Sequence, residues 1–517
     1  MTGSSSAALR PQHPRPRSLR GLADAFALEV RGDLGAREVT GVSLASGAVE
    51  PGDLYVGMPG RHAHGADFAA AAAERGAVAV LTDASGAVRA AAAVPELPVL
   101  VTDDPRAALG GIAAWIHGSD ENRATLVAVT GTNGKTSVVY LLFGILQQLG
   151  EVAGLTSTAE RRIGDEAVTS ALTTPEASEL HALLARGREL GARAVGVEVS
   201  AQALSRHRVD GLVFDVAGFT NLTHDHLDDY ASMDEYFRAK LELFQPDRAR
   251  RGVVIVDSEW GRRLAAEAGI PITTLATVPE VDADWRVAFG AETATHTDFT
   301  LEARDGRRLA TRVPLLGRYM AANAALAIAL LVEAGIDFGR IADALSRDGG
   351  IRAYIPGRAE RVSGERGPVV YVDYGHSPDA FLQTLSAIRR FAEGRVIMLF
   401  GADGDRDTTK RAEMGAIAAR GSDVVVVTDF HPRTEDPAAI RAALIAGARA
   451  AVPDREIHEI ADPRAAFRAA LALASEGDVI LYAGPGHEDY HEVNGEKIPY
   501  SARDDARQAL REAGWPA

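Results

Sequence analysis

A phosphate-binding loop is indicated by the run Gly131-Thr132-Asn133-Gly134-Lys135-Thr136-Ser137. A β-branched run that predicts a strand precedes it, and residues 137–149 have the apolar spacing of a helix. Backbone amides at the start of such a helix can surround a polyphosphate, while Lys135 supplies a positive charge and Thr136 can ligate Mg²⁺. We therefore interpret the loop as an ATP site, although Val129 replaces the first glycine of its common form. The alternative is a glycine-rich helix entry that binds nothing.

Further polar residues follow apolar runs in the same part of the chain. Glu198 ends a strand-like run and suits Mg²⁺, although a solvated glutamate at a strand end is an equal alternative. His226 stands with several acidic residues after another apolar run. Because α/β proteins bind ligands at the carboxyl ends of parallel strands, we expect these residues at one site. Lys240 lies among apolar residues of helical period, where a lysine usually extends its charged end to solvent.

Composition excludes several classes of protein. The 517-residue chain has a formal net charge of −16 and contains no cysteine. The acidic balance argues against general nucleic-acid binding, and the lack of cysteine excludes disulfides, thiolate metal sites and a cysteine nucleophile. No apolar run reaches the length of a membrane span, so we expect a cytoplasmic protein. Residues 1–21 are rich in arginine, proline and serine and predict a disordered basic tail rather than a signal peptide.

The elements that must position these residues alternate along the chain. Strand-like runs and alanine-rich helical stretches follow one another, which predicts parallel sheets and an α/β fold. Behind the tail we expect three domains, at 22–121, 122–354 and 355–517. The third contains strand-like runs of its own, at 369–372, 396–400, 424–428 and 479–482.

In order and spacing, these motifs resemble the Mur ligases. The resemblance is carried by Gly131 to Thr136, Glu198-Val199-Ser200, Asn221-Leu222 with Asp225-His226-Leu227-Asp228, residues 236–244, Pro356-Gly357-Arg358, residues 373–379 and Gly404-Asp405-Arg406-Asp407. It covers nearly the whole chain after residue 22. It implies an N-terminal UDP-binding α/β domain, a central parallel-sheet domain like that of P-loop ATPases, and a C-terminal Rossmann-like α/β domain that binds an amino acid.

Within this family, the chain is most similar to the members that add the third residue of the peptidoglycan stem peptide. Their substrates would be ATP, a diamino acid and UDP-MurNAc-L-Ala-D-Glu. The resemblance implies UDP-MurNAc-dipeptide contacts at Ser46, Arg61, His62, Ala63, Thr173, Thr174, Ser200, Arg206 and Arg208. It implies amino-acid contacts at Arg406, Phe430, His431, Arg433, Gly484 and Glu488. We expect the chain to act as a monomer, without a nucleic-acid partner.

The resemblance also implies a mechanism, in which ATP activates a carboxylate as an acyl phosphate that the incoming amine attacks. Residues 131–137 would hold the phosphates of ATP, with Asn323, Asp373 and His376 near its nucleoside. The implied catalytic set is Lys135, Glu198, His226, Lys240 and Arg358. Thr136 and Glu198 would bind one Mg²⁺ and His226 a second, while Lys240 would be carbamylated by CO₂ and so become an anionic metal ligand. Because the reactants meet between domains, we expect a closing motion that excludes water.

Some positions depart from the family pattern, and the one that bears on specificity is in the amino-acid pocket. Members that select meso-diaminopimelate typically carry Asp-Asn-Pro-Arg, where this chain has Phe430-His431-Pro432-Arg433. The residues favour a diamino acid and leave meso-diaminopimelate, L-lysine and L-ornithine open. Ala45, Gly47, Leu172 and Met320 also depart from common family residues.

Two other functions remain open from the sequence. One is a different amide ligase of the same superfamily, similar to folylpolyglutamate synthetase. The other is an ATP-binding scaffold without catalysis.

Overall fold

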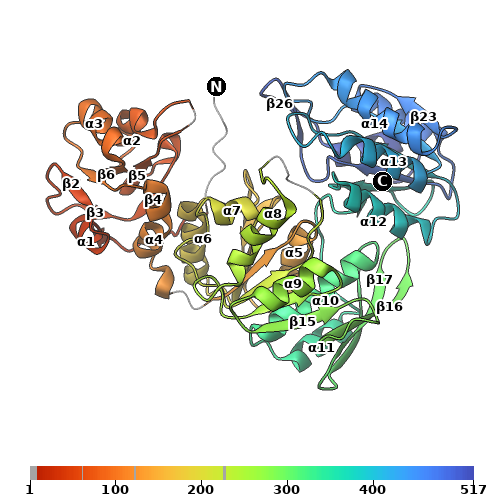
Figure 1. The fold of residues 1–517 in the computed structure, drawn as a ribbon, viewed down its shortest axis with the longest axis horizontal. Helices are drawn as coiled ribbons and strands as arrows, with labels where there is room; N and C mark the ends of the chain where they lie inside the picture. The colour runs from red at the N-terminus through yellow and green to blue at the C-terminus, as the bar shows by residue number, and fades with distance from the viewer. Residues whose placement is uncertain (1–8, 61, 122–123, 225–228) are drawn as a thin grey trace.

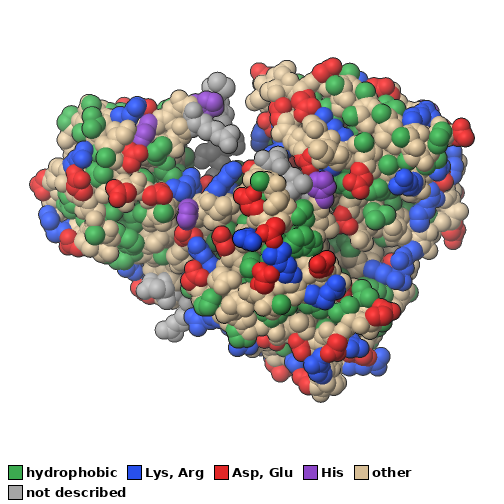
Figure 2. Space-filling view, viewed as in Figure 1, with side chains coloured by type: hydrophobic (Ala, Val, Ile, Leu, Met, Phe, Trp, Pro, Cys, Tyr) green, Lys and Arg blue, Asp and Glu red, His purple; other side chains and the backbone are tan. Residues whose placement is uncertain are grey.

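The computed structural model describes residues 9–60, 62–121, 124–224 and 229–517. Three α/β domains follow one another along the chain, each built on its own sheet (Figure 1). This arrangement confirms the fold class expected from the alternation of strands and helices. In the described part of the chain, no helix is both long and apolar enough to cross a membrane. Basic and acidic side chains are interspersed over the face drawn in Figure 2.

The first domain carries a five-stranded sheet in the order β2-β7-β6-β5-β4, in which only β2 runs antiparallel to its neighbour. Apolar residues of the central strands are buried on both faces, as expected for a sheet covered by helices. Its strands are β1 Arg17–Ser18, β2 Glu29–Arg31, β3 Glu38–Val39, β4 Gly41–Ser43, β5 Asp53–Gly57, β6 Ala79–Thr82 and β7 Val99–Val101. Its helices are α1 Leu19–Ala25, α2 Ala69–Glu74, α3 Ala84–Ala93 and α4 Pro105–His117, with the 3₁₀ turns η1 Ser46–Ala48, η2 Gly65–Phe68 and η3 Ser119–Glu121.

Residues 9–18, which we name the N-terminal strap, connect the first and second domains. Arg10 donates to both carboxylate oxygens of the buried Asp53, at 2.8 and 2.9 Å. The backbone amides of Gln12 and His13 donate to the carboxylate of Glu189, at 2.8 and 2.7 Å. The expectation of a disordered tail up to residue 21 is therefore wrong from residue 9 onward. Composition suggested disorder, but buried and part-buried carboxylates elsewhere in the chain supply partners for this segment.

The second domain contains an eleven-stranded sheet in the order β11-β10-β9-β12-β8-β13-β14-β15-β16-β17-β18. Its middle, from β9 to β16, is parallel, whereas β10–β11 and β17–β18 add antiparallel hairpin strands at the two ends. The strands are β8 Thr125–Thr130, β9 Ala153–Thr156, β10 Glu160–Ile163, β11 Glu166–Thr169, β12 Ala194–Glu198, β13 Val216–Phe219, β14 Gly252–Ile255, β15 Ile272–Ala276, β16 Trp285–Glu292, β17 Thr297–Ala303 and β18 Arg308–Val313. The sequence did not reveal these antiparallel additions.

Helices cover both faces of the central sheet. Along β8, Val127 and Val129 pack toward α5 and α10, whereas Leu126 and Ala128 belong to the core formed with α6 and α8. The helices are α5 Lys135–Gln148, α6 Ala177–Glu189, α7 Ala201–Ser205, α8 Met233–Leu241, α9 Glu259–Glu267, α10 Arg318–Glu333 and α11 Phe338–Arg347, and the 3₁₀ turn η4 Glu242–Phe244 extends α8. Helices α5 and α8 occupy segments for which the sequence predicts helical periodicity.

The third domain has a six-stranded sheet in the order β19-β20-β24-β21-β22-β23, parallel except for β19. Helices α12 to α14 pack on one face and α15 and α16 on the other. The strands are β19 Glu360–Arg361, β20 Val369–Asp373, β21 Val396–Phe400, β22 Val424–Val427, β23 Glu456–Glu459, β24 Val479–Ala483, β25 Tyr490–Val493 and β26 Glu496–Pro499. The helices are α12 Pro378–Arg389, α13 Arg411–Gly421, α14 Pro437–Ala451, α15 Pro463–Leu473 and α16 Ala502–Glu512.

Carboxyl ends of strands from the second and third domains meet at one cavity of about 2300 Å³. Residues after β8, β12 and β13 line it from the second domain, and residues after β20, β21, β22 and β24 line it from the third. Ligands of α/β proteins bind at this end of parallel strands. The cavity is therefore the candidate site.

Candidate active site

The loop between β8 and α5 has the geometry of a phosphate-binding loop. Gly134 caps the helix in the left-handed conformation (φ 89°), and a Cβ atom there would lie 2.6 Å from Oδ1 of Asn323. Asn221 holds the loop in place, because its Oδ1 accepts a hydrogen bond from the backbone amide of Asn133 at 2.9 Å. The first amides of α5 have no partner within the helix and lie beside the cavity, where they suit an anion.

Glu198, at the end of β12, is buried next to the start of α5. Its Oε2 accepts from the hydroxyl of Thr136 at 2.9 Å and from the amide of Thr158 at 3.0 Å. The hydroxyl and carboxylate oxygens are of the type that Mg²⁺ prefers. The expected pair of Mg²⁺ ligands, Thr136 and Glu198, is thus brought together and fits a Mg²⁺ ion completed by water and phosphate oxygens.

Two lysines share a carbonyl of the loop. Lys135 donates to the carbonyl oxygens of Gly131 and Thr132, at 3.1 and 2.9 Å, and its Nζ lies 4.0 Å from Oε1 of Glu198. Lys240 on α8 is 1% exposed, donates to the same Gly131 carbonyl at 2.9 Å, and lies over the ring of Tyr236. The ordinary interpretation of Lys240, a charged end in solvent, is therefore wrong. The side chain instead points to the phosphate loop.

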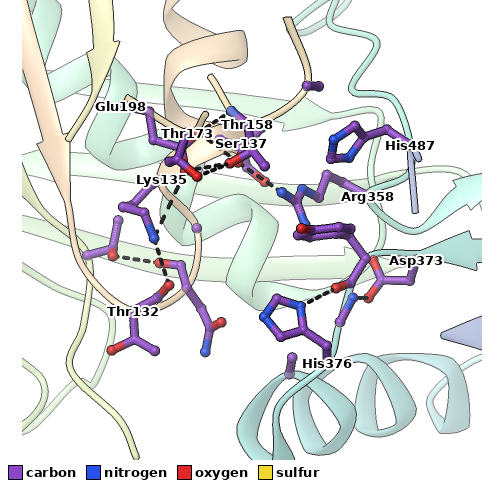
Figure 3. A pocket seen from close by; sticks show the side chains of 18 of the residues that line it. Thr132, Lys135, Ser137, Thr158, Thr173, Glu198, Arg358, Asp373, His376 and His487 are labelled. Atoms are coloured by element: carbon purple, nitrogen blue, oxygen red, sulfur yellow. Dashed lines mark hydrogen bonds and ion pairs between the residues drawn. The ribbon is translucent and has the colours of Figure 1, made fainter. Parts of the chain in front are cut away.

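Among the described residues, Arg358 and Asp379 of the third domain contact the loop region, and Figure 3 shows Arg358. Arg358 lies over the ring of Tyr374 and donates from Nη2 to the hydroxyl of Thr136 at 2.9 Å. At the start of α12, Asp379 accepts from Nδ2 of Asn133 at 3.0 Å. The sequence singled out Arg358, but it gave no role to Asp379.

Asp373 and His376 line the same cavity from the end of β20, as does Asn323 from α10. Both carboxylate oxygens of Asp373 accept backbone amides, from Ala359 at 2.7 Å and from Gly375 at 2.7 Å. Asp373 therefore shapes the turns that carry Arg358 and His376. Nδ1 of His376 lies 2.8 Å from the carbonyl oxygen of Tyr374.

The sequence analysis gave no individual role to Thr158, Tyr374 or His487 in this region, although Tyr374 lies within the motif at 373–379. Thr158 and His487 contact residues from distant parts of the chain, so local spacing gives no signal for their roles. His487 packs against Tyr374, with ring centroids 4.9 Å apart. Burial and the nearby Arg358 guanidinium lower the pKa of His487 to about 3, so its imidazole stays neutral.

The residues expected to contact the muramoyl-dipeptide divide into two groups. Thr173, Ser200, Arg206 and Arg208 line the cavity. Thr174 is fully buried, donates to the carbonyl of Glu198 at 2.8 Å and accepts from the amide of Ser200 at 3.1 Å. Its hydroxyl therefore organises the chain beside Glu198.

In the first domain, Ser46, His62 and Ala63 lie outside the lining of this cavity. Ser46 begins η1, directly after β4 of the first sheet. Arg61 and His226 lie outside the described residues. Within the described residues, no group of three or more histidine, aspartate and glutamate side chains is arranged to hold a metal.

The expected amino-acid residues gather in the third domain. Arg406, Phe430, His431, Arg433, Gly484 and Glu488 all line the cavity, at loops that follow β21, β22 and β24. His431 is buried and its Nε2 lies 2.7 Å from Oε2 of Glu488. Arg433 has a positive φ of 53°, and its Nη2 donates to Asp403 at 3.3 Å.

Three family models match successive parts of the chain: the Mur ligase family catalytic domain at 38–115, the Mur ligase middle domain at 129–331 and the Mur ligase glutamate ligase domain at 357–486. A Leifsonia xyli protein named UDP-N-acetylmuramyl-tripeptide synthetase is 71% identical over 515 residues and is covered over its full length, as is this chain. A Streptomyces coelicolor protein named UDP-N-acetylmuramoyl-L-alanyl-D-glutamate–2,6-diaminopimelate ligase is 46% identical over 93% of both chains.

Solved structures share the fold of this chain. A structure of a UDP-N-acetylmuramoyl-L-alanyl-D-glutamate–2,6-diaminopimelate ligase has a TM-score of 0.65 at 26% identity and covers 97% of this chain and 100% of its own. Mycobacterium tuberculosis folylpolyglutamate synthase, with a TM-score of 0.57 at 19% identity, covers 72% of this chain and 91% of its own. With its three domains, its phosphate loop and these relatives, the chain belongs to the Mur ligase family.

Proposed function

We propose that this chain is the ATP-dependent ligase that joins a diamino acid to UDP-MurNAc-L-Ala-D-Glu. The diamino acid thereby becomes the third residue of the peptidoglycan stem peptide. The observation that carries the proposal is one continuous cavity. It joins the phosphate loop, the arginines Arg206 and Arg208, and the charged pocket around Glu488. ATP, an anionic peptide and an amino acid can therefore meet there. The names of the relatives support the same reaction.

The first step brings two anions together, the terminal carboxylate of the dipeptide and the γ-phosphate of ATP. A carboxylate oxygen attacks phosphorus, ADP leaves, and an acyl phosphate remains. Lys135 and the amides of the loop hold the phosphates, and Arg358 supplies a second cation from the third domain. When bound at Thr136 and Glu198, Mg²⁺ would neutralise phosphate charge.

The second step forms the amide bond. The uncharged amine of the incoming amino acid attacks the acyl carbon, phosphate leaves, and the nitrogen gives up a proton. Water competes with the amine for the acyl phosphate, so the reaction needs an enclosed site. The contacts of Arg358 and Asp379 with the phosphate loop hold the third domain over it.

We further propose that Lys240 acts as its carbamate. Its ammonium shares the Gly131 carbonyl with Lys135, which places a buried cation beside a part-buried one. Reaction with CO₂ replaces one of these positive charges by a negative one. The carbamate oxygens would provide a metal ligand of the kind that Mg²⁺ prefers.

A folylpolyglutamate synthetase-like function is the weaker candidate, because that neighbour covers 72% of this chain and the diaminopimelate ligase structure covers 97%.

Purified enzyme with ATP, Mg²⁺, UDP-MurNAc-L-Ala-D-Glu and a panel of diamino acids should release phosphate and yield the tripeptide product. Lys135→Ala should lower kcat by about a hundredfold or more, since it removes a cation from the transferred phosphate. Arg308→Ala, on strand β18 and outside the cavity lining, serves as a control for the loss of an exposed cation. Product formation from a folate and glutamate, but not from the dipeptide, would contradict the proposal.

A further inference from the structure

The far end of the cavity, away from the phosphate loop, is lined by charged side chains of both signs. Loops after β21, β22 and β24 bring Asp403, Arg433 and Glu488 to this end, and the hairpin β25–β26 adds Glu492. We refer to these four residues, with His431, as the distal pocket. Their contacts decide which charged group of an amino acid side chain can bind.

The guanidinium of Arg433 is already occupied. Its Nη2 donates to Asp403 Oδ1 at 3.3 Å, its Nη1 donates to the carbonyl of Gly404 at 3.3 Å, and its Nε lies 3.3 Å from Glu492 Oε2. Backbone hydrogen bonds with Glu492 and Asn494 fix the residue at its positive φ. A carboxylate arriving here would meet an arginine already flanked by two carboxylates. That approach is unfavourable, because two negative charges stand beside the one cation.

Glu488, by contrast, is held by a neutral partner. Nδ1 of His431 accepts from the backbone amide of Glu492 at 2.8 Å, so the ring proton lies on Nε2 and is donated to Glu488 Oε2 at 2.7 Å. The imidazole is 3% exposed and packs against Phe430 and Tyr490. A neutral donor orients the carboxylate without cancelling its charge. Glu488 therefore remains available to an ammonium group.

The pKa of the Tyr490 phenol reflects the charges around it. Burial first, and then the carboxylates of Glu488 and Glu492, raise the pKa of Tyr490 to about 12, while Arg433 only partly opposes them. Tyr374 also has its pKa raised, first by burial and then by the same glutamate. At these two phenols Glu488 thus acts in the same direction as burial, although the ammonium of Lys497 also lies over the ring of Tyr490.

We propose that the amino acid added by this enzyme is an L-diamino acid with one carboxylate, whose side chain ends in an ammonium that Glu488 binds. An amino acid with a second carboxylate at its far end, such as meso-diaminopimelate, is disfavoured by Asp403 and Glu492 beside Arg433. The inference rests on the proposed function and narrows it. It also sets this chain apart from the 46% identical relative, whose name specifies 2,6-diaminopimelate.

The first test compares kcat/KM for L-lysine, L-ornithine, L-2,4-diaminobutyrate and meso-diaminopimelate in the full-length enzyme. At least one single-carboxylate substrate should exceed meso-diaminopimelate by about tenfold or more, as expected for a repulsive charge in a specificity pocket. A preference for meso-diaminopimelate would overturn the inference. Trapping of the acyl phosphate with hydroxylamine, in the absence of any amino acid, distinguishes failure of this inference from failure of the proposed function. If no hydroxamate forms from UDP-MurNAc-L-Ala-D-Glu, the proposed function itself is wrong.

The second test examines the charges individually. Glu488→Gln should raise KM for the best ammonium-ended substrate by about tenfold or more, with little change in KM for ATP. It should also reduce the discrimination between L-lysine and L-norleucine, which lacks the terminal amine. Glu496→Gln, on the exposed strand β26, is the matched control.

The double variant Asp403→Asn/Glu492→Gln should improve the use of meso-diaminopimelate relative to that of the single-carboxylate substrate, because it releases Arg433. An unchanged ratio between L-lysine and L-norleucine in Glu488→Gln, or an unchanged ratio between substrates in the double variant, would contradict the assignment.

Discussion

The side chain of Lys240 touches the phosphate loop, although a lysine in an apolar helix would ordinarily extend to solvent. If it acts as a carbamate, Lys240→Ala should lose most activity, and added bicarbonate should not restore it. A short carboxylate such as acetate or formate should restore part of it by serving as the missing ligand. Steady-state kinetics of the variant with and without such acids measure this effect. Full activity of an enzyme whose Lys240 is shown by mass spectrometry to be unmodified would contradict the role.

Residues at the site differ in how far the sequence could reveal them. Lys135, Thr136 and Glu198 were predictable, because a glycine loop and a strand end fix their positions locally. Thr158 and Asp379 were not, since each joins the site through a contact made only when distant segments fold together. The same holds for the role of Asp373, whose oxygens bind backbone amides of neighbouring turns.

Elements show a similar division. The helices α5 and α8 and the strands β20, β21, β22 and β24 of the third sheet follow from apolar patterns, which burial on one or both faces requires. The outer strands β19 and β23 of that sheet were not predicted. The hairpin strands β10–β11, β17–β18 and β25–β26 were missed. They have mixed burial and take their place by pairing with a neighbour, so their own sequences carry a weak signal.

Where helix α4 of the first domain packs on α6 of the second, two histidines are buried. His181 donates from Nε2 to the carbonyl of Asp210 at 3.0 Å, and its Nδ1 accepts from the hydroxyl of Ser119 at 2.6 Å. Burial lowers its pKa to about 4, and burial also lowers the pKa of His117 to about 3. Both are therefore neutral in the folded protein at pH values where they are charged in the unfolded chain.

The sign of the pH dependence follows from these values. Below the unfolded pKa of 6.5, the unfolded chain binds more protons, so stability should fall between pH 6.5 and 4, by about 1.4 kcal/mol per pH unit for each histidine. Above pH 6.5 these groups contribute no slope. His181→Gln keeps one donor and one acceptor and should reduce the slope, as measured by denaturant unfolding across this range. Equal slopes in the two proteins would contradict the assignment.

At the scale of the whole molecule, the N-terminal strap holds the first domain to the second. Arg10→Ala leaves the buried carboxylate of Asp53 without its cation, which typically costs about 3–5 kcal/mol. The variant should therefore lower the temperature of the first calorimetric transition. Arg15→Ala is the control from the same segment, because Arg15 is largely exposed and its ion pair with Glu121 contributes little. Identical thermograms for both variants would show that the strap does not stabilise the first domain.

The two contacts from the third domain to the phosphate loop, at Asn133 and Thr136, have a kinetic consequence. A nucleotide held beneath them can leave only after both have broken and a whole domain has turned through the solvent. Movement of the third domain against solvent, rather than the chemical step, would then limit kcat. Added sucrose should lower kcat nearly in proportion to the viscosity of the medium, and Asp379→Asn should weaken that dependence. A kcat indifferent to viscosity would place the slow step in the chemistry.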